Sequence, residues 1–124
     1  MTGTGAGDPQ LARVLVERHG GTVLARLSGE IDLSNANAVE DQVTGSLSGA
    51  TGVAVDLSGL SYLDSAGLAL LVRLSGRLGS ASGSLRLVVA PDAVVGRTLS
   101  VSGLAAAIPV DETVEAALAA LAPA

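Results

Sequence analysis

The pattern of apolar and polar positions changes its period between residues 53 and 78, and this change predicts a strand followed by a helix. A short apolar run, residues 53–55, is closed by Asp56, as is typical of a buried strand. Farther along, leucines recur every three or four positions, which places them on one face of a helix; they are Leu68, Leu71, Leu74 and Leu78. The polar segment between them, residues 58–64, predicts a connecting loop.

The same two periods predict the elements that precede this stretch. Residues 11–18 and 22–27 predict the two strands of a hairpin, because they flank a turn at residues 19–21. Residues 28–32 then predict a loop. The next apolar positions have helical spacing, and Asp32 or Ser34 is the expected N-cap of that helix; the positions are Ala36, Val39, Val43 and Leu47.

The C-terminal part is predicted to contain two more strands and two more helices. Residues 85–89 form an apolar run expected at the centre of the sheet, whereas Pro109 assigns residues 104–110 to an edge strand. Pro91 suits the first turn of a helix that ends at Gly103. Asp111 is the expected cap of the last helix, whose apolar stripe comprises Val114, Ala117, Leu118 and Leu121.

Strands that alternate with helices after an opening hairpin predict an α/β fold with a mixed β-sheet and about four helices. The later strands should be joined by right-handed crossovers. We expect residues 1–10, which are rich in glycine and threonine, to be a flexible N-terminal tail. Residues 11–124 should form a single domain.

Ser65 lies at the predicted start of the helix that follows the buried strand. Helix N-termini leave backbone N–H groups unpaired and carry partial positive charge, so an anion attached to this serine would be stabilised there. An ordinary N-cap role is the alternative for Ser65, with Asp64 as a rival cap. The sequence leaves both interpretations open.

A stripe of mostly small residues is predicted on the outer side of this helix, opposite the leucines. Small outward residues let another surface approach closely, although an alanine- and glycine-rich composition would also explain them. Gly76 is notable because glycine costs a helix about 1 kcal/mol relative to alanine. The stripe comprises Ser65, Ala69, Val72, Arg73 and Gly76.

Composition narrows the class of protein. The 124 residues are 48% hydrophobic, which suffices for one core, and the single aromatic residue means that leucine, valine and alanine must fill it. No long uncharged apolar stretch predicts a membrane span, and no signal peptide is visible, so we expect a cytoplasmic location without membrane insertion. A net charge of −5, with seven arginines and no lysine, makes direct nucleic-acid binding a poor prediction.

The chain lacks the residue sets of common catalytic sites, so we predict no enzyme, cofactor or metal. His19 is the single histidine and is expected to be solvated in a turn, which leaves no Ser-His-Asp set. Four carboxylates are predicted in loops after strands, the edge where open α/β sheets bind ligands. Solvated acids and helix caps are commoner than a cation site; these residues are Glu30, Asp32, Asp56 and Asp64.

Three segments together carry a family resemblance: residues 27–32 (LSGEID), residues 56–58 with 63–68 (DLS and LDSAGL), and residues 102–104 (SGL). With this order and spacing, the chain resembles the single-domain bacterial anti-sigma factor antagonists built on the STAS domain. The likeness extends from about residue 11 to the end. Many members have Ser or Thr where Ala66 stands here, and this departure leaves the acceptor position itself intact.

The resemblance implies a partner-switching protein. In that family an anti-sigma factor of the histidine-kinase-like ATPase type phosphorylates the serine after the aspartate, which here is Ser65. The unphosphorylated antagonist binds the anti-sigma factor and releases a sigma factor, and a serine phosphatase restores the binding form. The implied partner-binding residues are Glu30, Asp32, Asp56, Asp64, Ala66, Gly67, Ala69, Val72, Arg73 and Gly76.

The same resemblance allows other functions. Some STAS proteins are scaffold subunits of stress-signalling assemblies, and others are accessory subunits of lipid-transporting ABC ATPases. A small-ligand sensor is a third class, although no pattern in the sequence predicts a pocket.

Overall fold

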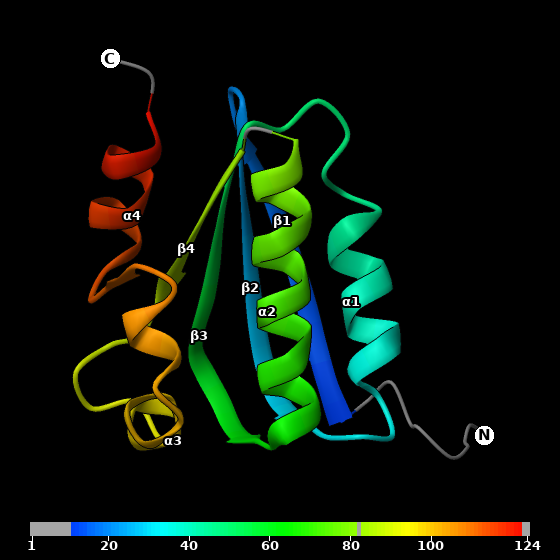
Figure 1. Cartoon of the computed structure of the whole chain (residues 1–124), viewed down its shortest axis with the longest axis vertical. Helices are drawn as coiled ribbons and strands as arrows, with labels where there is room; N and C mark the ends of the chain where they lie inside the picture. The colour runs from blue at the N-terminus through cyan, green and yellow to red at the C-terminus, as the bar shows by residue number, and fades with distance from the viewer. Residues whose placement is uncertain (1–10, 82, 123–124) are drawn as a thin grey trace.

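The computed structural model describes residues 11–81 and 83–122, and it has the predicted α/β architecture (Figure 1). The predicted N-terminal tail lies outside the described residues. The elements follow one another as β1 (Ala12–His19), β2 (Thr22–Ile31), α1 (Ala36–Thr44), β3 (Gly52–Leu63), α2 (Ser65–Ser80), β4 (Ser84–Val88), α3 (Gly96–Ser102), the 3₁₀ helix η2 (Leu104–Ala106), β5 (Val110–Asp111) and α4 (Val114–Leu121).

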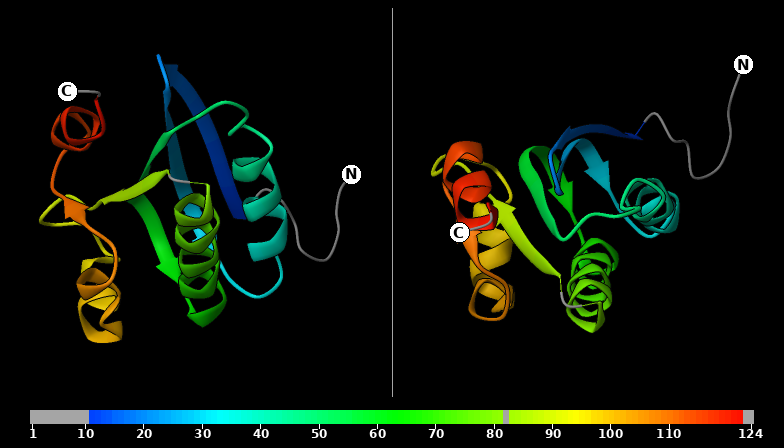
Figure 2. Two further views of the ribbon diagram at one scale, coloured as in Figure 1. Left: turned by 45° about the horizontal axis from the view of Figure 1, so that its top comes forward. Right: turned by 90° about the horizontal axis from the view of Figure 1, so that it is seen from above.

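The five strands form one mixed sheet in the order β1-β2-β3-β4-β5. The predicted hairpin is confirmed: β1 and β2 are antiparallel, and Gly20 and Gly21 form the turn, with Gly20 at φ +63°. The remaining neighbours are parallel, so each later strand is reached through a helical connection. Helices α1 and α2 cover one face of the sheet, and α4 covers part of the other (Figure 2).

The core is aliphatic, as the composition requires. Between the sheet and the pair α1/α2, the leucines of the predicted helical face are buried at Leu71, Leu74 and Leu78. On the opposite face a smaller cluster, which includes Leu24 and Ala54, packs against α4. Within residues 11–81 and 83–122, no helix is long and apolar enough to cross a membrane.

Strands β2 and β3 are longer than predicted, and the two loops expected at residues 28–32 and 58–64 are wrong. These two polar segments pair with each other, and Ile31 lies opposite Leu63 at the end of the ladder. Two register irregularities each add one residue to β3. The extra residues break the alternation of two, so that side chains three apart, Leu57, Leu60 and Leu63, all point into the core.

Four predicted starts or ends of helices and strands also differ in the structure, and the first two concern α1 and α3. Asn35 is the N-cap of α1, since Asp32 forms a turn with Ser34. Helix α3 begins at Gly96, because two turns occupy the segment after Pro91; its predicted end at Gly103 is confirmed.

Farther along, the predicted edge strand 104–110 shrinks to the two residues of β5, because its start folds into η2. It does lie at an edge, and β4 lies between β3 and β5. Thr113 caps α4 by accepting a hydrogen bond from the amide of Ala116, while Asp111 forms an ion pair with Arg86 at 2.7 Å.

Gly29 combines a left-handed backbone with a close approach, so Gly29→Ala should be strongly destabilising. Its φ is +89°, and a Cβ there would collide with the carbonyl group of Leu11. We expect a loss of about 2–4 kcal/mol in the free energy of unfolding, measured by urea denaturation. Gly103→Ala is the matched control: φ is +79° but the surrounding space is open, so about 1 kcal/mol is expected. Equal losses at both positions would show that the contact with Leu11 is unimportant.

Candidate functional site

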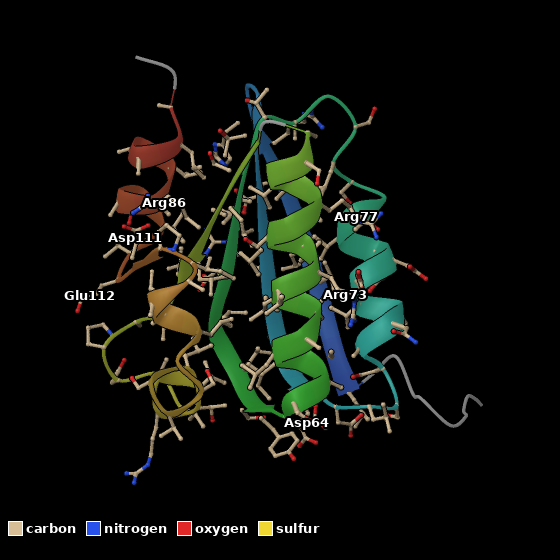
Figure 3. All side chains as sticks on the ribbon, in the orientation of Figure 1. Asp64, Arg73, Arg77, Arg86, Asp111 and Glu112 are labelled. Atoms are coloured by element: carbon tan, nitrogen blue, oxygen red, sulfur yellow. The ribbon has the colours of Figure 1, made fainter. Side chains whose placement is uncertain are left out.

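Ser65 is the first residue of α2, and its neighbour Asp64 is the N-cap. The Asp64 Oδ1 atom accepts hydrogen bonds from the amides of Ala66 at 2.8 Å and Gly67 at 3.2 Å. Of the two caps that the sequence allowed, the structure therefore selects Asp64 (Figure 3). Ser65 is exposed, and among the described residues no hydrogen bond engages its hydroxyl. This leaves a serine hydroxyl accessible at the start of a helix.

The outer stripe of α2 faces solvent as the helical wheel predicts. Ala69, Val72, Arg73 and Gly76 are all exposed, and Ala66 is half-buried beside them. A Cβ added at Gly76 would meet no atom within 4 Å, so the space outside this position is open. We call Ser65, Ala69, Val72 and Gly76 the α2 face; it is uncharged, and apart from Val72 its side chains are small.

Gly67 does not belong to this surface, and its contact with a partner stays a prediction. It is buried on the inner side of α2. A Cβ at this position would collide with the side chain of Leu63 and lie 3.2 Å from the Cγ2 atom of Ile31. Gly67 is therefore needed for close packing of α2 against the ends of β2 and β3.

Three of the four predicted rim carboxylates gather where β2 and β3 end. Glu30 is exposed near the end of β2, and Asp32 follows that strand. The amide of Asp64 donates to the carbonyl of Ile31 at 3.3 Å, which ties the start of α2 to the end of β2. Hydrogen bonds from the hydroxyl and amide of Ser34 lower the pKa of Asp32. The strand ends beside Ser65 thus carry the carboxylates of Asp32 and Asp64, whereas the side chain of Glu30, which alternates with the buried Ile31, points to the other face of the sheet.

Asp56 lies elsewhere and not in the loop predicted after its strand, whereas its role in partner binding stays a prediction. It sits within β3 and, by the alternation of the strand, on the same face as Ala54, which packs under α4. Its Oδ2 atom is 3.6 Å from Nη1 of Arg26 on the adjacent strand. The side chain of Asp56 therefore lies on the face of the sheet that packs against α4.

Arg73 is held by an acid that the sequence did not predict. The buried Glu40 of α1 accepts a hydrogen bond from Arg73 Nε at 2.9 Å. It also forms ion pairs with Nη2 of Arg73 at 2.8 Å and Nη2 of Arg77 at 3.8 Å, and Figure 3 shows both arginines reaching from α2 toward α1. The hydrogen bond to Glu40 raises the pKa of Arg73 above its ordinary value. In the sequence, this contact is indicated only by the four-residue spacing of Arg73 and Arg77, which places both side chains on one side of a helix. Because Arg73 leans toward α1, it borders the α2 face rather than occupying its centre.

A hollow of about 360 Å³ borders the start of α2 on its other side, between α2 and α3. Its lining includes Leu68, Arg97 and the exposed side chain of Val101. It also includes Ser102, which belongs to one of the three segments that carry the family resemblance. Sequence analysis missed Arg97 and Val101, because nothing in the spacing of α3 indicates that it lies beside α2.

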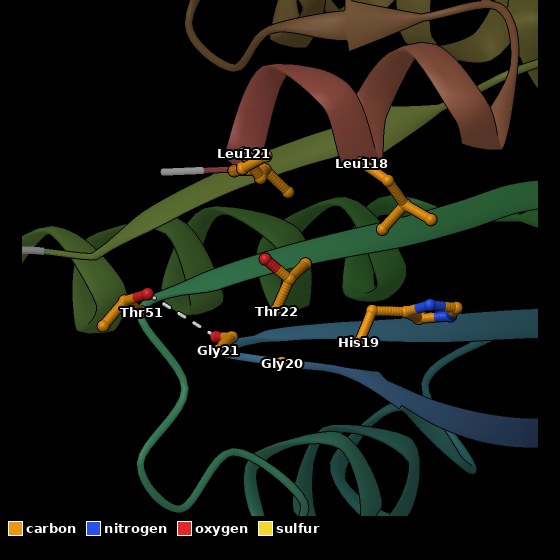
Figure 4. Close-up of a pocket in the computed structure, with 8 residues that line it drawn as sticks. His19, Gly20, Gly21, Thr22, Thr51, Leu118 and Leu121 are labelled. Atoms are coloured by element: carbon orange, nitrogen blue, oxygen red, sulfur yellow. Dashed lines mark hydrogen bonds between the residues drawn. The ribbon is translucent and has the colours of Figure 1, made fainter. Parts of the chain in front are cut away.

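A second hollow, of about 390 Å³, lies at the opposite end of the sheet between the hairpin turn and α4 (Figure 4). Leu118 and Leu121 form one wall, and His19 and Thr51 contribute polar groups. Among residues 11–81 and 83–122, no three His, Asp or Glu side chains are grouped to hold a metal ion. The sequence predicted no pocket at this place.

Comparisons with known proteins agree on the kind of domain. A sequence model of the STAS domain family matches residues 13–117. The anti-sigma-F factor antagonist RsfB of Mycobacterium tuberculosis is 33% identical over 98 residues, covering 77% of this chain and 78% of that protein.

Solved structures give the same result. The crystal structure of an anti-sigma factor antagonist from Mycobacterium paratuberculosis has a TM-score of 0.79 at 31% identity and covers 91% of this chain and 96% of its own. The anti-sigma factor antagonist SpoIIAA in its unphosphorylated form has a TM-score of 0.69 at 23% identity, over 86% of this chain and 93% of its own, which supports the fold alone.

Proposed function

Since this chain belongs to the STAS domain family, among its anti-sigma factor antagonists, we propose that it binds an anti-sigma factor through the α2 face and that phosphorylation of Ser65 switches this binding off. The observation that supports the proposal best is the position of Ser65. A serine hydroxyl free of hydrogen bonds among the described residues stands at one end of an uncharged, open helical surface.

The geometry around Ser65 suits a phosphoacceptor better than a structural serine. Asp64 already caps α2, so the hydroxyl of Ser65 is not needed for capping. In the reaction, Ser65 Oγ would attack the γ-phosphorus of ATP, a new P–O bond would form, and the bond to ADP would break. The cap engages the Asp64 carboxylate, so we assign the removal of the hydroxyl proton to the kinase.

The partner proposed here is an anti-sigma factor that is itself an ATPase of the histidine-kinase type, and a serine phosphatase would reverse the modification. The uncharged α2 face permits close approach, since Ala69 and Gly76 carry almost no side chain. The carboxylates of Glu30, Asp32 and Asp64 lie at the ends of β2 and β3 and would favour a basic patch on the partner. Binding of the anti-sigma factor would in turn release its sigma factor.

Phosphate incorporation tests this proposal directly. Incubated with the anti-sigma kinase and ATP, the wild-type protein should take up one phosphate, and Ser65→Ala should take up none, as measured by intact-protein mass spectrometry. Ser61→Ala is the matched control, because Ser61 is an exposed serine four residues earlier on β3. Labelling that persists in Ser65→Ala would remove this residue from the mechanism.

A further inference from the structure

Strand β1 forms a long, regular edge of the sheet. It pairs with β2 along all eight residues in an unbroken register, and within the described residues no strand pairs with its other side. Figure 2 shows β1 at the rim of the sheet. Natural edge strands are usually shortened, bulged or interrupted by proline, because a long regular edge offers its backbone to another strand. β1 has none of these three devices.

The hairpin determines which backbone groups point outward. In a two-residue hairpin the residues that flank the turn, here His19 and Thr22, form a hydrogen-bonded pair. Hydrogen-bonded pairs then recur at every second residue, so the odd-numbered residues of β1 bond to β2. The amides and carbonyls of the even-numbered residues, from Ala12 to Arg18, therefore face the free edge.

In one antiparallel register, the side chains of β1 are complementary to those of β1 in a second copy of the chain. If a twofold axis passes through Leu15, Arg13 lies opposite Glu17 of a second copy, and the two Leu15 side chains meet. The even-numbered residues then form the hydrogen-bonded pairs, with Val14 opposite Val16, as the free edge requires. We propose that β1 pairs in this register with β1 of a second copy of this chain, which joins two sheets into a symmetric dimer.

The exposed side chains of β1 fit this partner. Leu15 is 65% exposed on the α4 side of the sheet, in a part that α4 does not cover, and Val16 is exposed as well. Among the described residues Arg13 has no ion-pair partner, while the carboxylate of Glu17 is half exposed and contacts Arg26 at 3.3 Å. Pairing would cover both Leu15 side chains and give Arg13 an opposite charge on each side of the axis.

Other registers that satisfy the same backbone hydrogen bonds fit less well. An axis at Val14 places Arg13 opposite Leu15, and an axis at Val16 places Leu15 opposite Glu17. An axis at Glu17 sets two carboxylates against each other. Only the axis at Leu15 pairs opposite charges and apolar residues at once, so the charge pattern selects a single register.

This dimer is independent of the proposed switch. Ser65 lies on α2, beyond the end of β3, and β2 separates that strand from β1. Pairing through β1 uses no residue of the α2 face. Failure of the dimer and failure of the Ser65 switch would therefore be seen in separate experiments.

Sedimentation velocity of the full chain, from low micromolar to near-millimolar concentration, tests the association. The wild type should shift from monomer toward dimer. Arg13→Glu and Glu17→Arg should each weaken the dimer about tenfold, because like charges then face each other twice, and the double variant should recover affinity. A wild type that stays monomeric throughout, or a double variant no better than the single ones, overturns the proposal.

Disulfide trapping tests the register, because the chain contains no cysteine. Leu15→Cys places two thiols at the axis in a non-hydrogen-bonded pair, where Cα atoms lie about 4.5 Å apart and within reach of a disulfide. Mild oxidation should convert this variant to a covalent dimer. Val94→Cys is the matched control, since Val94 is 67% exposed and lies outside β1. Equal cross-linking of the two variants contradicts the register.

Discussion

Phosphate on Ser65 is expected to weaken binding to the anti-sigma factor by about a hundredfold or more while leaving the fold of the free protein unchanged. Phosphoserine adds roughly −1.5 to −2 charges near neutral pH. A close interface at the α2 face would have to desolvate this charge. A hundredfold loss corresponds to about 2.8 kcal/mol, a modest cost for a dianion without a matching cation.

Within the free protein the local effects nearly cancel. A helix N-terminus stabilises an exposed anion by about 0.3–1 kcal/mol. Asp64 already occupies the amides of Ala66 and Gly67, so fewer donors remain for the phosphate. The Asp64 carboxylate also repels it. Neither contribution is large enough to remodel α2.

Titration of the anti-sigma factor with phosphorylated and unphosphorylated protein measures the effect on binding, and amide hydrogen exchange on the free protein measures the effect on the fold. Ser65→Ala separates the loss of the hydroxyl from the gain of charge, and we expect it to bind within about threefold of wild type. Widespread loss of amide protection in the free phosphoprotein would show that phosphate acts by remodelling, and the blocking mechanism would then be abandoned.

Gly76→Glu is the second change with a large expected effect, a loss of about a hundredfold or more in affinity for the anti-sigma factor. The introduced carboxylate would project from the open end of the α2 face opposite Ser65 and hold the partner away. The fold should not suffer, because no atom lies within 4 Å of the new Cβ and glutamate is a better helix former than glycine. Stability measured by urea denaturation should equal or exceed that of the wild type.

Ala69→Arg should have the same effect from a second position on the α2 face. Ala119→Arg is its matched control, since Ala119 is also exposed and helical but belongs to α4, on the other face of the sheet. Binding should fall for Ala69→Arg and stay unchanged for the control. If Gly76→Glu or Ala69→Arg binds as tightly as the wild type, the small residues of α2 reflect composition and not a contact surface.

Features that depend on neighbours along the chain could be predicted from the sequence. The leucine spacing gave the buried side of α2 and, with it, the outward direction of Ala69 and Gly76, because a helix fixes the angle between successive side chains. The hairpin followed from the turn at Gly20 and Gly21. The place of Ser65 at the start of a helix followed from the change of period, since Asp64 marks the same boundary.

What only the tertiary structure decided is which distant segments meet. The polar stretches that end β2 and β3 look like loops alone, and they become strands because each supplies the hydrogen bonds that the other lacks. The same pairing brings Ile31 and Leu63 against Gly67, which gives this residue a role in packing. Strand alternation sends Asp56 to the far face, and α1 brings Glu40 to Arg73. The spacing of apolar residues specifies which face of a single helix or strand is buried. Contacts between elements depend on the order and register of the strands, which the spacing within one element does not determine.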